Sequence, residues 1–486
     1  MVNGQETLKE KTAQGLLWGG ISNGIQQLLS LLFGIFLARL LTQADYGLVG
    51  VLTVFSAIAS ALQEGGFISA LNKKKEVTHR DYNAVFWCST LCSLCLYALL
   101  WLAAPLIANF YEEPILTPLS RYLFIGFVIS SLNIAPRAYL FRNLKVKETS
   151  IITICSILIS GIIGVSMAAS GYAFWGIATQ TIAYVGCMTV LCFAFTRWHP
   201  TLPVDFAPIR EMIGFSSKLI ITNVFSIINN NLFSNILGKF YSMSVVGNFS
   251  QANKWNQMGH NLITNMLYGV AQPVFTKVED DKERQLKVLR KLLRFTAFIS
   301  FPMMFGLSIV SKEVIVITIT ERWIESAGIL SLLCIWGAFV PLSSLFSNLI
   351  ISRGHSSVYM WCTISLCLTL LLAVIAASPL GFQWMLRLFI GINILWLFVW
   401  FWFVRQEVGL RLRDMLLDIA PYLLLSAALT LFASYITAGI SNLYLSLLAK
   451  VVIVALCYVG ILWLARSKIL HDSILFFIEK FSHKKS

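Results

Sequence analysis

The sequence has few charged residues. Asp, Glu, Lys and Arg make up 12% of the 486 residues, about half the share found in an ordinary soluble domain. Hydrophobic residues make up 57%, and the mean hydropathy is +0.75. A chain with so few polar side chains cannot cover a water-exposed surface, which excludes a soluble globular protein. The composition therefore predicts a membrane protein.

Several other signals are absent. The sequence lacks the short alternating segments of an outer-membrane barrel, so the membrane protein is expected to be all-α. It also lacks the motif G-x-x-x-x-G-K-[ST], which argues against an ATP-driven pump. Cys88, Cys92 and Cys95 lie inside an apolar run, where a thiol behaves as a small hydrophobic group. No metal site or cofactor is predicted.

Long apolar runs recur from one end of the chain to the other. Each is close to the roughly 20 residues that a helix needs to cross the hydrocarbon core. We expect an all-α polytopic protein with about 14 transmembrane helices. The candidate spans lie near 14–38, 47–71, 84–108, 116–138, 149–170, 173–196, 213–237, 245–272, 295–318, 328–351, 358–378, 384–404, 416–438 and 443–465.

The basic residues predict the orientation of these spans. If the N-terminus is cytoplasmic, most of the 37 Lys and Arg residues fall in inner segments, as the positive-inside rule requires. We therefore expect both termini to lie in the cytoplasm. The formal net charge of +14 follows from this bias, so no nucleic-acid partner is predicted. The basic segment 276–294 is expected to be an amphipathic helix on the cytoplasmic face, separate from the span at 295–318.

The two halves of the chain resemble each other. When the sequence is shifted by 200 residues, Asn23 aligns with Asn223 and Gly47 with Gly247. A unit of six spans repeated in parallel orientation is a common transporter plan, with the substrate held between the halves. We expect one six-helix bundle at 1–212, a second at 213–415, and an additional helix pair with a cytoplasmic tail at 416–486.

Polar side chains interrupt several of the spans. Asn229, Asn230 and Asn231 follow Lys218 in one span, and the next contains the sequence NFSQANKWNQMGHNLITNM. In it, Asn253, Gln257, His260 and Thr264 share one helical stripe. Such groups need partners, because lipid offers none. They could line an aqueous central cavity or hydrogen-bond neighbouring helices, and we take the cavity as the working hypothesis.

The chemistry of these groups suggests what the cavity would bind. Lysine binds phosphate as a point charge, and amides suit sugar hydroxyls because they both donate and accept hydrogen bonds. The basic groups outnumber Glu64, the one acid among them. Glu64 is either a partner for a lysine or a site that couples transport to H⁺ or Na⁺. The candidate cavity residues are Gln26, Arg121, Lys218, Asn223, Asn229, Asn230, Asn253, Lys254, Gln257, His260 and Asn261.

Several longer strings resemble a known family. They include KEKTAQGLLWGGISNGIQQLL, ARLLTQADYGLVGV, GGFISALNKKK, RDYNAVFW, APRAYLFRNLKVK and VFTKVEDDKERQLKVLRKLLRFTAFISFPMMFGL. They are similar to the Wzx-type polysaccharide flippases of the multidrug/oligosaccharidyl-lipid/polysaccharide exporter superfamily. The resemblance covers both halves of the chain and weakens over the last spans.

The resemblance implies two six-helix bundles around a central cavity. It also implies alternating-access transport of a lipid-diphosphate-linked oligosaccharide, with Lys218 and Lys254 as the matching cationic positions. Membrane lipids, a polysaccharide polymerase and export machinery are the further partners expected. Two alternatives stay open at this point. One is a multidrug/cation antiporter of the same superfamily, and the other is a membrane-bound polysaccharide polymerase or glycosyl transferase.

Overall fold

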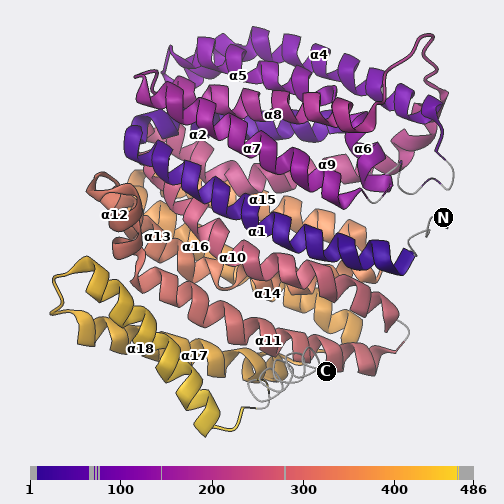
Figure 1. Cartoon of the computed structure of the whole chain (residues 1–486). Helices are drawn as coiled ribbons and strands as arrows, with labels where there is room; N and C mark the ends of the chain where they lie inside the picture. The colour runs from indigo at the N-terminus through magenta and orange to yellow at the C-terminus, as the bar shows by residue number, and fades with distance from the viewer. Residues whose placement is uncertain are drawn as a thin grey trace, which may run out of the picture. The chain divides into compact units, whose positions relative to one another are not determined.

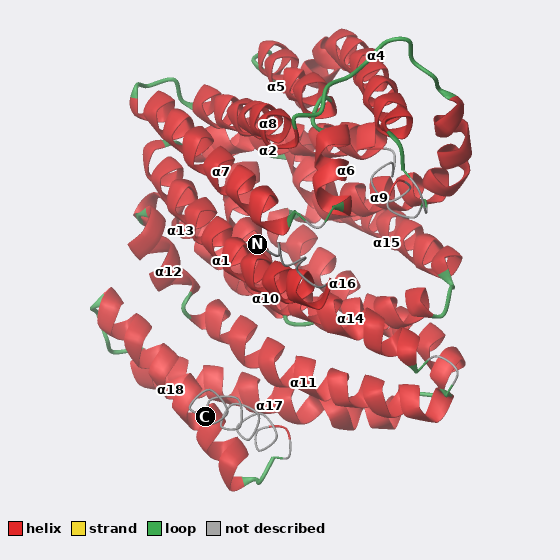
Figure 2. Ribbon diagram, turned by 45° about the vertical axis from the view of Figure 1, so that its right-hand side comes forward, coloured by secondary structure: helices red, strands yellow, loops and turns green. Residues whose placement is uncertain are grey.

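The computed structural model describes residues 8–64, 71, 74, 77–143, 145–278, 281–467 and 469. Within these ranges the chain forms helices and loops and no strand, as Figure 2 shows. The predicted all-α class is therefore confirmed. Large apolar side chains lie on the outside of many helices, among them Leu102, Leu431 and Leu456 at 68%, 73% and 69% exposure. An apolar exterior of this extent suits lipid rather than water.

The chain divides into two compact units, Met1–Gly247 and Asn248–Ser486. The first contains α1 (Leu8–Leu40), α2 (Gln43–Glu64), α4 (His79–Tyr111), α5 (Leu116–Ser131), α6 (Ile134–Arg142), α7 (Val146–Ala169), α8 (Phe174–Thr196), α9 (Ala207–Phe240) and the start of α10 (Met243–Lys277) (Figure 1). The second contains the rest of α10, α11 (Lys282–Ile309), α12 (Ser311–Ile319), α13 (Ile324–Gly337), α14 (Val340–Ser352), α15 (Ser356–Ala377), α16 (Phe382–Val408), α17 (Leu412–Thr437) and α18 (Leu443–Leu464).

In the first unit, α7 packs against both α8 and α1, and α4 packs against α5. Helix α9 packs against α2 and α4. The second unit is arranged around α11, which contacts α13, α14, α16, α17 and α18. The division of the chain at 212/213 and at 415/416 stays a prediction.

One span in each unit is broken in its middle. Helices α5 and α6 meet at Leu132 and Asn133 with a bend of 45°, and α13 gives way to α14 at Ala338 and Phe339. Pro136 and Pro341 explain both breaks, because proline has no N–H for the carbonyl four residues earlier and its ring clashes with that carbonyl. The two prolines lie in matching strings, APRAYLFRN and VPLSSLFSN. The breaks are therefore a further sign of the internal repeat.

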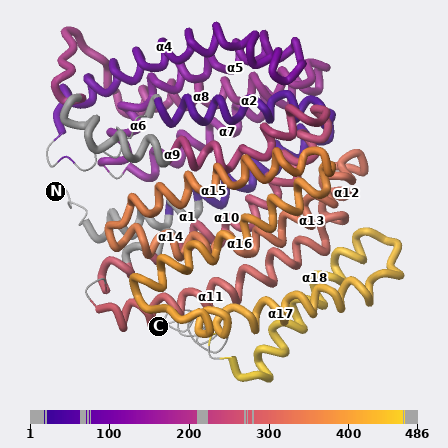
Figure 3. Tube along the Cα trace, turned by 180° about the vertical axis from the view of Figure 1, so that it is seen from behind, coloured from indigo at the N-terminus to yellow at the C-terminus, as the bar shows by residue number. Residues whose placement is uncertain are grey.

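The helices α17 and α18 form a pair, drawn in yellow tones in Figure 3. Arg290 and Arg294 of α11 form ion pairs with the buried carboxylate of Asp418 in α17, at 2.7 and 2.8 Å. Lys450 of α18 forms an ion pair with Glu313 of α12. The hydroxyl of Ser446 donates a 2.7 Å hydrogen bond to the same Glu313 carboxylate. Ion pairs therefore fasten each helix of the pair to the rest of the second unit.

The number of spans differs from the sequence prediction. Among the described residues, 11 helices are long and apolar enough to cross a membrane, or 12 if the bent pair α5–α6 counts as one span. The predicted count of 14 is thus not confirmed by this criterion. Helices α9 and α10 account for the difference: α10 is too polar to qualify, and part of α9 lies outside the described residues.

The expectation for segment 276–294 was partly wrong. Its second half is helical, but it forms the first half of α11, which runs without interruption from Lys282 to Ile309. The helix starts at Asp281, whose carboxylate accepts a 2.9 Å hydrogen bond from the backbone N–H of Arg284. The ion pairs of Arg290 and Arg294 with α17 give this basic half a protein partner. It is therefore not a separate interfacial helix.

The Glu313–Lys450 pair generates a stability prediction. Replacing Lys450 with Met would leave the Glu313 carboxylate, whose side chain is 4% exposed, without its cation. Breaking a buried pair in this way costs about 3–5 kcal/mol, so we expect a clear fall in the melting temperature measured by tryptophan fluorescence in detergent. Lys312→Met is the control, because Lys312 is adjacent to Glu313 but exposed. Equal melting temperatures for both variants would show that the pair does not stabilise the fold.

Candidate functional site

The asparagines at the end of α9 contact neighbouring helices. The hydroxyl of Tyr111 in α4 donates a 3.0 Å hydrogen bond to Asn235 Oδ1, and the hydroxyl of Thr53 in α2 lies 3.4 Å from Asn231 Oδ1. The Nδ2 groups of Asn231 and Asn235 donate to backbone carbonyls four residues earlier, at 2.9 and 2.8 Å. For these two residues the structure supports interhelical hydrogen bonding, the alternative that the sequence left open.

The described α9 residues that the sequence assigns to the cavity do not form these interhelical hydrogen bonds. Asn223 and Asn230 are exposed, and Asn229 is half-buried. The Oδ1 atom of Asn229 has no hydrogen-bond partner among the described residues. Lys218 belongs to α9, but its side chain lies outside the described part of the chain. Asn223 and Asn230 thus lie on the surface of α9, whereas the side-chain oxygen of Asn229 is buried.

Helix α10 has one buried and one exposed polar face. The buried face contains Asn256, His260 and Thr264, with exposures of 0%, 7% and 6%. The exposed face contains a row of polar side chains at helical spacing, namely Lys254, Gln257, Asn261 and Asn265. Asn253 is half-buried and lies between the two faces.

The boundary between these faces runs along the stripe that the sequence analysis identified. Gln257 lies on its exposed side, whereas His260 and Thr264 lie on its buried side. The structure therefore brings Lys254, Gln257 and Asn261 together on one accessible surface and separates His260 from them.

The buried face of α10 packs against α11 and α13. A Cβ atom on Gly337 of α13 would overlap the side-chain oxygen of Asn256, and one on Gly259 would lie 2.9 Å from the sulfur of Met304. The ring of His260 lies 6.3 Å from that of Trp336 in α13, measured between centroids. Nearer the start of α10, Asn248 donates a 2.6 Å hydrogen bond to Glu325 and accepts one of 2.9 Å from Ser326. These contacts fix the rotation of α10 in the second unit and so set which side chains are exposed.

Two predicted residues have local partners. Gln26 is half-buried and donates a 2.7 Å hydrogen bond to Ser22, one turn earlier in α1. The guanidinium of Arg121 in α5 stacks on the ring of Trp101 in α4, 3.9 Å from its centroid. Its Nε donates to the Trp101 carbonyl at 3.4 Å. Arg121 therefore contributes to the contact between α4 and α5.

Glu64, the candidate for ion coupling, ends α2, and its side chain lies outside the described residues.

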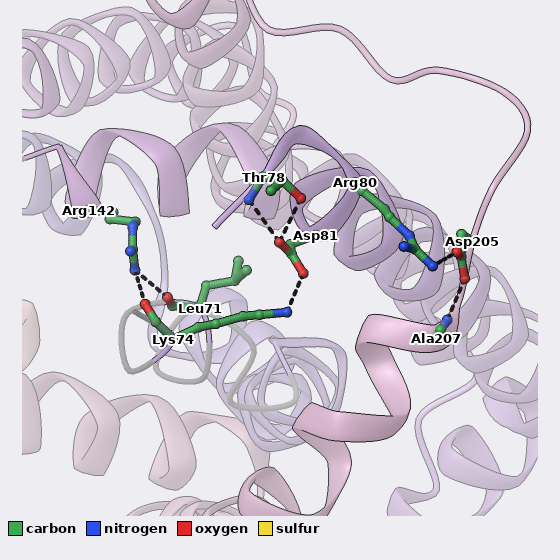
Figure 4. Close-up of polar contacts among 8 residues, drawn as sticks. All are labelled: Leu71, Lys74, Thr78, Arg80, Asp81, Arg142, Asp205 and Ala207. Atoms are coloured by element: carbon green, nitrogen blue, oxygen red, sulfur yellow. Dashed lines mark hydrogen bonds and ion pairs between the residues drawn. The ribbon is translucent and has the colours of Figure 1, made fainter. Parts of the chain in front are cut away.

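A polar network that the sequence analysis did not identify holds the start of α4 (Figure 4). Asp81 accepts hydrogen bonds from the backbone N–H and the hydroxyl of Thr78, at 2.8 and 2.9 Å, and forms a 2.8 Å ion pair with Lys74. Arg142 of α6 donates to the backbone carbonyls of Leu71 and Lys74, at 2.7 and 2.9 Å. The motif T-x-x-D was the available signal, because a hydroxyl residue followed three positions later by an acid is typical of a helix start.

Other residues at the start of α4 hold the segment between α8 and α9. Arg80 forms an ion pair with Asp205, and the other oxygen of Asp205 accepts a 2.8 Å hydrogen bond from the backbone N–H of Ala207 at the start of α9 (Figure 4). The side chain of Asn83 donates to the Thr201 carbonyl and accepts from the Thr201 N–H, at 2.8 and 2.9 Å. The side chains of Lys74, Arg80 and Arg142 therefore hold neighbouring segments of the first unit together.

Comparison with known proteins identifies the family. A family model described as "Polysaccharide biosynthesis protein" matches residues 36–328, more than half of the chain. The chain belongs to this family. The resemblance inferred from the sequence is thus confirmed, and the protein is a multi-pass bacterial membrane protein.

Relatives of this family member come from several bacteria. The lipopolysaccharide biosynthesis protein WzxC of Escherichia coli (strain K12) is 26% identical over 72% of this chain and 71% of its own length. The teichuronic acid biosynthesis protein TuaB of Bacillus subtilis (strain 168) is 23% identical over 94% of this chain and 96% of its own.

Solved structures show a shared fold. The lipid II flippase MurJ in an inward closed conformation superposes with a TM-score of 0.77 at 16% identity, covering 94% of this chain and all of its own. An inward-facing multidrug resistance transporter of the MATE family superposes with a TM-score of 0.65 at 15% identity, covering 79% of this chain and 94% of its own. Identities this low show the fold alone, so the cargo has to be argued from the side chains.

The two faces of α10 generate a prediction about water access. In a variant whose ten native cysteines are replaced, single cysteines at 254, 257 and 261 should react with a charged thiol reagent in membranes. Cysteines at 256, 260 and 264 should react roughly tenfold more slowly or not at all, because thiols must be reached by water to form the reactive thiolate. Labelling is measured by mass shift. Equal labelling along both faces would contradict the assignment of the accessible surface.

Proposed function

We propose that this protein is a flippase for a lipid-diphosphate-linked oligosaccharide, the repeat unit of a polysaccharide or O-antigen. It would move this cargo by alternating access from the cytoplasmic to the periplasmic side of the bacterial inner membrane. The protein would act as a secondary transporter and not as an enzyme.

The relatives support this cargo. WzxC and TuaB are named for the biosynthesis of lipopolysaccharide and teichuronic acid, and a further relative, ExoT of Rhizobium meliloti (strain 1021), is named a succinoglycan biosynthesis transport protein. The MurJ structure, which covers nearly the whole chain, is that of a lipid II flippase. Membrane-embedded lipid-linked glycans are therefore the cargo class most consistent with the family and the fold.

The observation that carries the proposal is the exposed row of α10. It presents one ammonium group, that of Lys254, beside the amides of Gln257, Asn261 and Asn265. A diphosphate would bind the ammonium as a point charge, and sugar hydroxyls would exchange hydrogen bonds with the amides. From Met243 to Lys277 the helix contains no acidic residue, so this surface attracts anions and repels cations.

The exposed row of α10 also distinguishes a flippase from the two alternative functions. A cation antiporter would be favoured by acidic side chains on the exposed row, where this chain has a lysine and amides. A polymerase or glycosyl transferase would need a catalytic acid or base in the accessible site. The flippase is therefore the function that the described side chains favour.

The orientation and the cavity complete the proposal. The two six-helix bundles at 1–212 and 213–415 would enclose a central cavity containing the predicted binding residues, with the helix pair at 416–486 outside it. Both termini would be cytoplasmic, and the Lys74–Asp81–Arg142 network would then lie on the inner side and Glu112, after the end of α4, on the outer side. A polysaccharide polymerase and export machinery would receive the product.

Lys254 provides the main test. Lys254→Ala should lower glycan export by roughly tenfold or more, because a charge-assisted hydrogen bond contributes about 1.5–3 kcal/mol. Lys254→Arg should retain much of the activity, since the charge is kept. Export is measured as surface polysaccharide in a strain that lacks its own flippase, at matched protein levels. Lys218→Ala should behave like Lys254→Ala, and Lys312→Ala is the control. Full export by both alanine variants would contradict a cationic binding site.

Glu64 provides a test of ion coupling. If its carboxylate exchanges H⁺ or Na⁺ during transport, Glu64→Gln should remove the dependence of transport on an imposed gradient in proteoliposomes. The amide cannot titrate but fills nearly the same volume. An unchanged gradient dependence would assign Glu64 to a structural role beside a lysine.

A further inference from the structure

Two glycines lie where two helix starts cross in the first unit. Helix α2 begins at Gln43 and α10 begins at Met243, and both follow a short turn after a long helix. A Cβ atom on Gly47 would lie 2.7 Å from the carbonyl carbon of Met243 and closer still to its oxygen. A Cβ atom on Gly247 would lie 2.7 Å from the carbonyl carbon of Gln43 and closer still to its oxygen. No side chain larger than hydrogen fits at either position.

The two contacts are equivalent under the internal repeat. The shift of 200 residues converts Gly47 into Gly247 and Gln43 into Met243. Each glycine therefore contacts the residue that corresponds to the first residue of its own helix. Contacts that exchange partners in this way surround a two-fold axis, so a pseudo-two-fold axis passes between the two helix starts. An inverted repeat would place these starts on opposite sides of the membrane, and the contact thus requires a parallel repeat.

At the two glycines the helix starts meet through backbone atoms. At each glycine a Cα–H group points at a backbone carbonyl oxygen, which is the arrangement of a Cα–H···O contact. Small residues of this kind allow helix backbones in membranes to approach closely.

Further contacts lie at the same end of the first unit. Lys239 of α9 donates a 2.9 Å hydrogen bond to the Phe110 carbonyl and forms a 3.1 Å ion pair with the exposed Glu112. A Cβ atom on Gly238 would lie 2.7 Å from a methyl group of Val51. The start of α2 is itself rigid, because Asp45 accepts hydrogen bonds from the N–H and the hydroxyl of Thr42, at 2.9 and 2.6 Å. The crossing therefore joins preformed helix starts rather than a loop.

We propose that the Gly47–Gly247 crossing is the closure that seals one end of the transport path. This inference rests on the proposed function, and the positive-inside pattern places the crossing at the outer end. The two glycines set the population of the closed state: with both present the helix starts meet, and a side chain at either position holds them apart. Because the two contacts share one axis, loss of either one opens both.

Hydrogen–deuterium exchange of the full-length protein in nanodiscs tests this property directly. Gly47→Ala and Gly247→Ala should each accelerate exchange in both peptides, 43–53 and 243–253, by roughly tenfold. The double variant should exchange no faster than the single variants, since one lost contact already opens the crossing. Gly186→Ala is the matched control, because Gly186 lies within α8 with no atom in reach of an added Cβ.

The outcomes separate this inference from the proposed function. Faster exchange in both peptides with either variant, accompanied by loss of glycan export, supports the closure. Faster exchange confined to the mutated helix, or additive effects in the double variant, would overturn it even if the protein exports glycan. Exchange that behaves as expected in a protein that never exports glycan would leave the crossing in place and overturn the flippase function instead.

Discussion

Hydrocarbon offers no hydrogen bonds, and this constraint governs every polar group in the spanning helices. A charged or amide side chain there needs a partner within the protein or access to water. The described part of the chain shows the first solution repeatedly. Glu313 has Lys450 and Ser446, and Asp418 has Arg290 and Arg294. These contacts hold α17 and α18 to α11 and α12, so the polar groups that are costly in lipid also position the helices.

The two most polar helices resolve the constraint differently. The end of α9 uses Asn231 and Asn235 to contact α2 and α4. Helix α10 instead buries Asn256 and His260 on one side and exposes Lys254 and Gln257 on the other. Interhelical hydrogen bonding and an accessible polar surface are therefore not exclusive explanations. The first occurs at the end of α9 and the second on α10. Which of the two applies depends on the neighbours that each helix contacts.

The fold is shared with transporters that carry different cargo, as the MurJ and MATE structures show. Backbone arrangement therefore cannot determine what is carried, and the accessible side chains must do so. An acid-free α10 with a lysine among amides suits a phosphate-linked sugar. The broken spans at Pro136 and Pro341 and the crossing at Gly47 and Gly247 follow the internal repeat of the chain. Gly247 and Lys254 belong to the same helix, so the proposed closure and the proposed substrate contact use different residues of α10.

The sequence by itself determined the all-α membrane class, most helix positions, the internal repeat and the family. These properties follow from hydropathy, helical periodicity and short strings, which depend on neighbouring residues in the chain. Only the tertiary structure decided which polar residues are accessible. Gln257 and His260 share a helical stripe, yet the contacts of α10 with α11 and α13 bury one and expose the other. The sequence likewise aligned Gly47 with Gly247, but their reciprocal contact arises from two helices that lie 200 residues apart. Burial and contact across such distances depend on how helices pack against one another, which no local pattern encodes.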